Sequence, residues 1–245
     1  MVETAINLYS VRDLDEPMLD IVDRVADAGY DGIQISGGFR DATPAETAER
    51  IAERDLGVTP AHIGIEALED DLETTIADYR DTLGVSGAVV SYLGPKHFES
   101  RDAVDETAAR LSRIADRLSD RDWDLHYHNH AHEFVDLGGE SAFERLLQQA
   151  EDVLVELDVG WALVGGSDPA DLIETYGDRM TVLHMKDMVT DEERGFREIG
   201  TGDVDMAACA AAGRDAGVDW FVYEHDEPDD PAAAIRTGAE FLRDL

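Results

Sequence analysis

Eight short stretches rich in β-branched and aromatic residues recur along the chain, and the segments between them carry the 3.6-residue apolar periodicity of helices. The stretches cover residues 4–9, 30–36, 58–66, 85–93, 123–130, 153–159, 180–186 and 218–225. The units begin about 30 residues apart, which accommodates one strand, one helix and two short loops. This alternation predicts an α/β fold, and most simply one (β/α)8 barrel domain of parallel strands over residues 1–245.

Local signals mark the ends of the expected helices. Thr43 before Pro44 and Asp168 before Pro169 are typical of a cap followed by a first helical turn, and Gly29 ends an amphipathic run. A doubly wound open sheet is the alternative fold. Polar residues end almost every predicted strand, which favours a barrel, because a barrel assembles one site from all its strand ends.

The charge of the chain restricts its partners. With 56 acidic and 20 basic residues the formal net charge is −36, so the surface repels nucleic-acid phosphates and anionic lipid. We therefore expect no nucleic acid and no membrane as partner. The acids are spread over helix-like surface positions, which indicates a halophilic origin and a salt-rich cytosol; an acidic partner-binding surface is the alternative.

The cysteine content and the first residues of the chain bear on its compartment. Cys209 is the only cysteine, so no intrachain disulfide or thiolate metal cluster can form. The first residues lack the basic start and apolar run of a signal peptide, and we expect a cytoplasmic protein.

The polar residues at the predicted strand ends are the candidate site. Five of the eight histidines fall in the fifth strand, the loop after it and the seventh strand, a concentration that core packing does not explain, because each buried imidazole needs a partner. The strand-end polar residues are Tyr9, Ser10, Arg12, Gln34, His62, Glu66, Ser91, Tyr92, His126, His128, Asn129, His130, Glu156, Asp158, His184, Lys186, Asp187, Glu224, His225 and Asp226.

The fifth predicted strand reads LHYHNHAHEF. Strand alternation places His126, His128 and His130 on one face and Tyr127 and Asn129 on the other. Same-face neighbours on one strand are about 6.6 Å apart, so all three imidazoles rarely reach one metal ion. We expect one of them to be a ligand and the others to contact substrate or support the ligands.

Carboxylates and a further histidine follow on the next strands. Glu156 and Asp158 share a face, and two inward carboxylates repel each other unless a cation lies near them. Asp158 is the better ligand, because Glu156 lies one layer deeper. With His184 and Glu224 they form a nitrogen and oxygen set without sulfur, which suits one Mn²⁺, Co²⁺, Fe²⁺ or Zn²⁺ ion, with Mg²⁺ also admissible.

Two weaker signals have structural alternatives. Lys186 can hold negative charge on a substrate, or form an ion pair with Asp187 or Glu156. The run GTGDVD at 200–205 loosely resembles a phosphate-binding loop, and a helix cap explains its glycines better.

Five motifs in chain order carry a family resemblance. They are NLYSVRD at 7–13, YHNHAHEF at 127–134, ELDVGW at 156–161, LHMKDM at 183–188 and EHD at 224–226. Together they resemble the sugar phosphate isomerase/epimerase family of the xylose isomerase-like TIM barrels, which includes epimerases, isomerases, inosose dehydratases and endonuclease IV. The resemblance runs from the first to the last strand and implies a single-domain TIM barrel. The endonuclease branch is disfavoured by the acidic surface.

The resemblance implies a single metal site. Single-metal members of the superfamily hold the ion between Glu, Asp, His and Glu on strands five to eight, which match His128, Asp158, His184 and Glu224 here. His128 in place of Glu is the first departure from the epimerase pattern. Trp161, where many epimerases have His, and Gln34, where relatives often carry Glu, are the others.

These features predict a carbohydrate isomerase or epimerase. The ion would chelate a carbonyl and an adjacent hydroxyl of a sugar, sugar phosphate or polyol and stabilise the enediolate formed when a proton leaves. Glu224 would be ligand and base, His128 or His130 would return the proton, and Lys186 would hold developing charge. The expected substrate-binding residues are Tyr9, Arg12, Gln34, His62, Glu66, Asn129, Glu156 and Trp161.

Two other functions stay open on the same residues. The first is elimination of a hydroxyl or glycosyl group, as in inosose dehydratases, with a histidine as the acid. The second is a non-catalytic sugar-binding or subunit barrel. A homo-oligomer is compatible with each of these functions.

Overall fold

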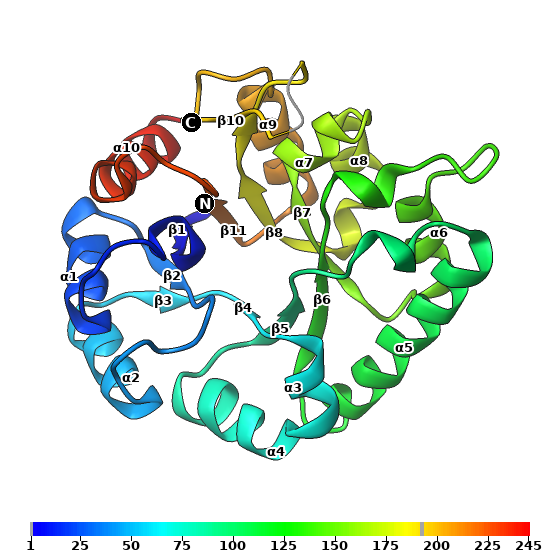
Figure 1. Cartoon of the computed structure of the whole chain (residues 1–245). Coiled ribbons are helices and arrows are strands. Elements are labelled where there is room, and N and C mark those ends of the chain that lie inside the picture. The colour runs from blue at the N-terminus through cyan, green and yellow to red at the C-terminus, as the bar shows by residue number, and fades with distance from the viewer. Residues whose placement is uncertain (1, 192–193) are drawn as a thin grey trace.

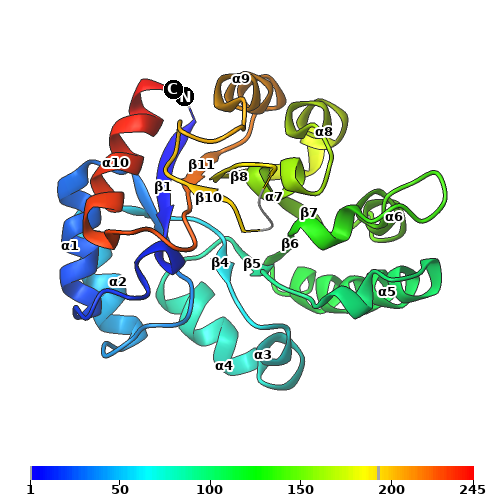
Figure 2. The ribbon, with the colours of Figure 1, turned by 45° about the horizontal axis from the view of Figure 1, so that its top comes forward.

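The computed structural model describes residues 2–191 and 194–245. Within this part of the chain, nine parallel strands follow the order β3-β2-β1-β11-β8-β7-β6-β5-β4 around a ring, with helices outside it (Figure 1; Figure 2). The strands are β1 (Glu3–Asn7), β2 (Gly32–Gln34), β3 (Gly57–Val58), β4 (Ala61–His62), β5 (Gly87–Val90), β6 (Asp124–His128), β7 (Leu154–Asp158), β8 (Met180–Met185) and β11 (Trp220–Tyr223).

The ring is the predicted barrel, and the open-sheet alternative is wrong. The first strand pairs with the last, with Glu3 opposite Trp220. The third predicted strand, 58–66, is too long. It consists of β3, which pairs with β2, and β4, which pairs with β5, separated by Thr59 and Pro60. Proline has no N–H for a strand ladder, and this break accounts for the ninth strand.

Helices follow the strands as expected. They are α1 (Met18–Ala28), α2 (Pro44–Glu53), α3 (Ile65–Asp70), α4 (Leu72–Thr75), α5 (Arg101–Ser119), α6 (Ala142–Gln149), α7 (Val159–Val164), α8 (Pro169–Tyr176), α9 (Met206–Ala216) and α10 (Pro231–Asp244). The 3₁₀ helices are η1 (Leu8–Val11), η3 (Pro95–His97), η4 (Ala131–Phe134) and η5 (Gly177–Arg179), and η2 (Ile76–Thr82) is a π-helix. Among the described residues, none of these helices has the length and apolar character needed to cross a membrane.

The predicted helix boundaries are confirmed. Thr43 and Glu46 form a reciprocal capping box at the start of α2, and the Asp168 carboxylate caps α8. Gly29 ends α1 at a φ of 91°, a left-handed conformation that glycine adopts without steric cost.

Apolar packing fills the barrel except at one end. The main core lies between strands and helices, and a smaller cluster of Ala5, Val182 and Val222, covered by Trp220, fills the barrel interior near the amino ends of the strands. The buried polar residues Asn7, Gln34, His128, Asp158 and His184 lie at or near the carboxyl ends. The fold thus separates an apolar base from a polar mouth.

A long loop follows β8 beside this mouth, and the Asp187 carboxylate holds its described part. The loop contains a hairpin of β9 (Asp187–Met188) and β10 (Phe196–Arg197). Asp187 accepts backbone N–H bonds from Gly200 at 2.9 Å, Gly202 at 2.8 Å and Val204 at 3.2 Å. A Cβ at Gly202 would lie 2.3 Å from Asp187 Oδ1, so glycine is required there. The GTGDVD glycines therefore bind an internal carboxylate, and the cap of α9 is Asp205.

Replacing Asp187 tests this anchor. Asp187→Ala leaves the backbone N–H groups of Gly200, Gly202 and Val204 without their acceptor, and we expect it to lower the free energy of unfolding by about 2–4 kcal/mol. Chemical denaturation in high KCl measures this loss. The exposed Glu106→Gln is the control and should change stability by less than about 0.5 kcal/mol. Equal stability of Asp187→Ala and the control would contradict this account of the loop.

Candidate active site

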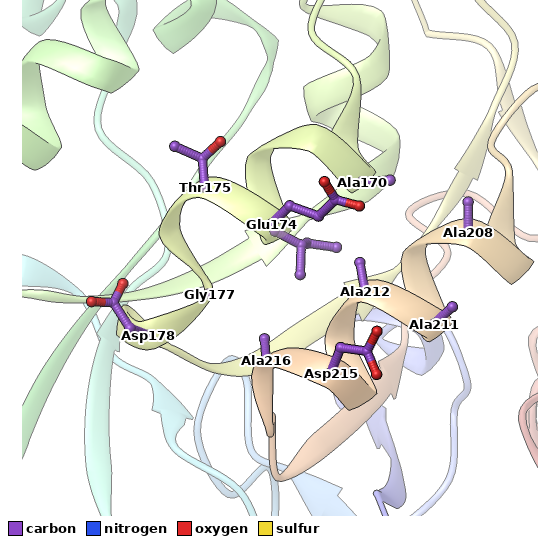
Figure 3. A pocket seen from close by; sticks show the side chains of 11 residues that line it. Ala170, Glu174, Thr175, Gly177, Asp178, Ala208, Ala211, Ala212, Asp215 and Ala216 are labelled. Carbon is purple, nitrogen blue, oxygen red and sulfur yellow. The ribbon is translucent and has the colours of Figure 1, made fainter.

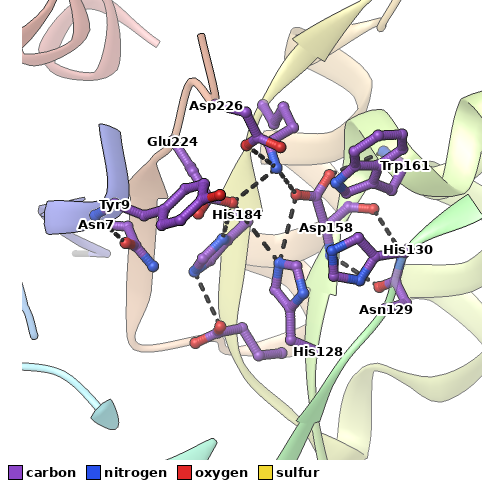
Figure 4. Close-up of polar contacts among 12 residues, drawn as sticks. Asn7, Tyr9, His128, Asn129, His130, Asp158, Trp161, His184, Glu224 and Asp226 are labelled. Carbon is purple, nitrogen blue, oxygen red and sulfur yellow. Dashed lines mark hydrogen bonds and ion pairs between the residues drawn. The ribbon is translucent and has the colours of Figure 1, made fainter. Parts of the chain in front are cut away.

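The candidate site lies where four adjacent strands end. His128 ends β6, Asp158 ends β7, His184 lies on β8, and Glu224 directly follows β11. The strand register sets Asp158 opposite His184, and side chains that are far apart in sequence converge inside the barrel mouth (Figure 4). All four are buried. The structure therefore brings together the four residues expected to hold a metal.

The ligand atoms of this quartet are close enough to share one ion. One nitrogen or oxygen from each of the four side chains lies within 4.8 Å of the others. His184 Nδ1 is 2.9 Å from Glu224 Oε2, and His128 Nε2 is 3.4 Å from Asp158 Oδ2. These distances are similar to those between neighbouring ligand atoms around a small cation.

Unpartnered polar atoms indicate that the quartet fits a cation. Both ring nitrogens of His128 are buried without a hydrogen-bond partner. Such atoms are costly to bury unless something binds them. Two imidazoles and two carboxylates form a donor set suited to a first-row divalent ion such as Mn²⁺, Co²⁺, Fe²⁺ or Zn²⁺.

His184 has the environment of a metal-binding imidazole. Its Nε2 is 2.7 Å from Gln34 Oε1 and 3.0 Å from Glu156 Oε1, while Nδ1 is directed to Glu224. Burial alone would lower the pKa of His184, but the charges of Glu156 and Glu224 raise it to about 10. A ring held by an acceptor on its far side is the usual arrangement of a histidine ligand.

Lys186 places a positive charge beside the quartet. Its Nζ lies 2.9 Å from Asp158 Oδ2, 2.8 Å from Glu224 Oε2 and 2.7 Å from Asp226 Oδ1. Burial would lower the pKa of Lys186, but these three carboxylates outweigh it and hold the pKa well above its usual value. The expected alternative partners, Asp187 and Glu156, are wrong, because each is bound to other groups.

His128 and His130 differ in protonation although they are two residues apart. Burial lowers the pKa of His128, but the nearby carboxylates of Asp158 and Glu224 raise it to about 9. Burial and the charges of His128 and Lys186 lower the pKa of His130 to about 2. Without a metal ion, His128 is therefore protonated at neutral pH, whereas His130 is a neutral imidazole.

Other expected site residues support Asp158 from outside the quartet. Asn129 exchanges two hydrogen bonds with the Asp158 backbone, at 2.9 Å and 3.1 Å. The Trp161 backbone N–H donates to Asp158 Oδ1 at 2.9 Å, and its indole lies beside the His130 ring. These contacts fix the direction of the Asp158 carboxylate.

A pocket of about 490 Å³ opens onto the quartet. Of the expected substrate-binding residues, Tyr9, His62 and Trp161 line it. The lining residues are Tyr9, Ser36, Gly37, His62, Ser91, Tyr92, His128, His130, Trp161, Lys186, Arg194, Glu224 and Asp226.

The remaining expected substrate-binding residues lie outside this lining. Arg12 stacks on the Tyr9 ring at 4.0 Å, and Glu66 is exposed on α3 beside a separate hollow. Gln34 and Glu156 are fully buried behind His184, where Glu156 also contacts His62. Their placement makes Gln34 and Glu156 supports of the site.

Two charged residues of the pocket, Asp226 and Arg194, had no specific role predicted from the sequence. Asp226 stands in the EHD motif and pairs with Lys186, and its position two residues after Glu224 could have indicated this. Arg194 arrives from the loop after β8 and pairs with Glu227, and nothing in its surrounding sequence indicates a site residue.

A larger hollow of about 630 Å³ lies away from the mouth, between α8 and α9 (Figure 3). Alanine methyl groups from these helices form much of its wall, with Glu174, Asp178 and Asp215 among its acids. No histidine lines it. The chemistry therefore belongs to the smaller pocket at the mouth.

The chain is similar to several known proteins in sequence or in structure. The inosose dehydratase of Geobacillus kaustophilus is 27% identical over 197 residues, which are 69% of this chain and 61% of that protein. A sugar phosphate isomerase/epimerase from Parabacteroides distasonis has a similar structure, with a TM-score of 0.83, 21% identity and coverage of 99% of this chain and 94% of that one. The IolI protein, solved with a bound zinc atom, has a TM-score of 0.78, 16% identity and coverage of 99% and 97%.

The structural similarities at these identities concern the fold. The family model described as xylose isomerase-like TIM barrel matches residues 22–245, from α1 through the last helix and across all four quartet positions. The chain belongs to the xylose isomerase-like TIM barrel family.

Proposed function

We propose that this protein is a divalent-metal-dependent enzyme that isomerises or epimerises a sugar or a related polyol. The observation that carries the proposal is the buried quartet of His128, Asp158, His184 and Glu224 beneath an open pocket, with ring nitrogens of His128 that have no hydrogen-bond partner. The similarity to a sugar phosphate isomerase/epimerase supports the same class of reaction.

The proposed roles follow from the charges of the site. When bound, the ion would polarise a substrate carbonyl and an adjacent hydroxyl and so acidify the neighbouring C–H bond. Burial raises the pKa of Glu224, but Lys186 and His184 outweigh it and hold the carboxylate ionised. Glu224 and the neutral His130 are the groups at the pocket that can accept a proton. Lys186 is a group that can donate one, and His128 is another when Asp158, His184 and Glu224 hold the ion without it.

Elimination is the second candidate function, and a specific observation favours it. His128 replaces the glutamate of the epimerase pattern. In this reaction Asp158, His184 and Glu224 would hold the ion, and His128, as an imidazolium, would donate a proton to a departing hydroxyl. The 27% identical relative is an inosose dehydratase, which supports the same outcome. Both reactions begin with loss of a proton beside a carbonyl and diverge afterwards.

Metal content tests the shared part of both proposals. Protein purified in high KCl without chelator should carry about one equivalent of Mn, Co, Fe or Zn, because four ligands converge on one position. Elemental analysis measures it. The His184→Ala/Glu224→Ala double variant removes two ligands and should carry none. Absence of metal from the wild type after reconstitution would contradict the metal-dependent proposal and favour a sugar-binding barrel.

Product analysis separates isomerisation from elimination. Metal-loaded protein incubated with keto sugars and inososes in D₂O should introduce deuterium next to the carbonyl. NMR and mass spectrometry then distinguish an equilibrating isomer from a product that has lost water. Glu224→Gln should reduce turnover at least about 100-fold, because the variant loses a ligand and a proton acceptor together. Full turnover with metal retained in Glu224→Gln would show that this mechanism is wrong.

A further inference from the structure

We propose that the side-chain amides of Asn7 and Gln34 form a positioning relay that orients His184 and leaves its Nδ1 free to bind a metal ion. The relay lies behind the quartet, on the barrel-interior side of His184, and touches neither the pocket nor the expected substrate. The inference rests on the proposed metal-dependent function, because it concerns how one ligand is held.

Backbone groups fix the orientation of both amides. At one end, the Tyr9 backbone N–H donates to Asn7 Oδ1 at 2.7 Å, and a backbone N–H can only donate. At the other end, Gln34 Nε2 donates to the Pro60 carbonyl at 2.8 Å, and a carbonyl can only accept. Asn7 Nδ2 then donates to Gln34 Oε1 at 2.6 Å. The orientation of each amide is thus set by a group that has a single hydrogen-bonding role.

This orientation determines which nitrogen of His184 carries hydrogen. Gln34 Oε1 is an acceptor, so His184 Nε2, 2.7 Å away, must donate to it. In the neutral ring Nδ1 then has no hydrogen and presents its lone pair 2.9 Å from Glu224 Oε2. Nδ1 of the neutral ring and Glu224 Oε2 are then two acceptor atoms side by side, which is the arrangement that two ligands of one ion require.

The same relay sets His62 and explains why residue 34 is an amide. Asn7 Nδ2 lies 3.3 Å from His62 Nδ1, so His62 accepts there and donates from Nε2 to Glu156 Oε1 at 2.5 Å. Glu156 Oε2 accepts from Gln34 Nε2 at 2.6 Å. Residue 34 must donate on the side facing Pro60 and Glu156 and accept on the side facing Asn7 and His184. Among residues of this size, only glutamine does both.

Paired substitutions at position 34 test the relay. Gln34→Met keeps the approximate volume but removes the acceptor, whereas Gln34→Glu keeps an acceptor oxygen for His184 Nε2. Zinc affinity is measured by competition with a chromogenic chelator in high KCl, and thermal denaturation shows that each variant is folded. Gln148→Met, on the exposed face of α6, is the matched control.

The relay predicts that Gln34→Met weakens zinc binding about 10- to 100-fold and that Gln148→Met stays close to the wild type. Gln34→Glu keeps the acceptor for His184 but loses the donors to Pro60 and Glu156, so its zinc affinity should fall between those of Gln34→Met and the wild type. In ¹⁵N-labelled, zinc-loaded protein, the Nε2–H signal of His184 should be present in the wild type and in Gln34→Glu, and shifted or exchange-broadened in Gln34→Met. Unchanged affinity and an unchanged His184 signal in folded Gln34→Met would overturn the relay while leaving the metal site intact. Absence of zinc binding by the wild type would instead overturn the proposed function, and the relay with it.

Discussion

Mutual compensation of buried charges is the constraint on which the mouth of this barrel depends. Asp158, Glu156, Glu224 and Asp226 are carboxylates withdrawn from water, and each would be expensive to bury alone. Lys186 touches three of them, and His184 lies between Glu156 and Glu224. Because every carboxylate faces a cationic or hydrogen-bond-donating group, the cluster stays ionised. The same arrangement brings ligand atoms of His128, Asp158, His184 and Glu224 within 4.8 Å of one another, where a divalent ion would complete the balance.

The rest of the fold keeps that cluster buried but accessible. An apolar base around Trp220 closes the far end of the barrel, so access is from the carboxyl ends of the strands. Asp187 is adjacent to Lys186 in sequence but has a structural role, since its carboxylate accepts hydrogen bonds from the backbone of the loop after β8. One aromatic wall is supplied by Trp161, whose backbone also holds Asp158. Successive side chains of a strand point to opposite faces, so neighbouring residues here have different roles, one structural and one chemical.

Much of this arrangement could be predicted from residue patterns. Alternating strand and helix signals gave the barrel, and strand-end chemistry gave the quartet, because residues at the carboxyl ends of parallel strands must meet. Prediction from the sequence failed for features that depend on contacts between distant segments of the chain or on a local break in a strand. The partners of Lys186 were misassigned because Asp158, Asp226 and Glu224 reach it from the ends of the two neighbouring strands, β7 and β11. Arg194 was overlooked because a loop, not a strand, brings it to the pocket. The break at Pro60 was missed because apolar residues continue on both sides of it.

The sequence by itself determined the architecture, the acidic surface and the set of side chains available at the mouth, because periodicity and composition are local properties of the chain. Only the tertiary structure decided what each of those side chains does. Gln34 is the clearest case, since its residue type suggested a substrate contact but its four hydrogen-bonding neighbours come from four different segments. Protonation was decided in the same way. His128 and His130 are two residues apart in the sequence. They differ in charge because carboxylates lie close beside only the first.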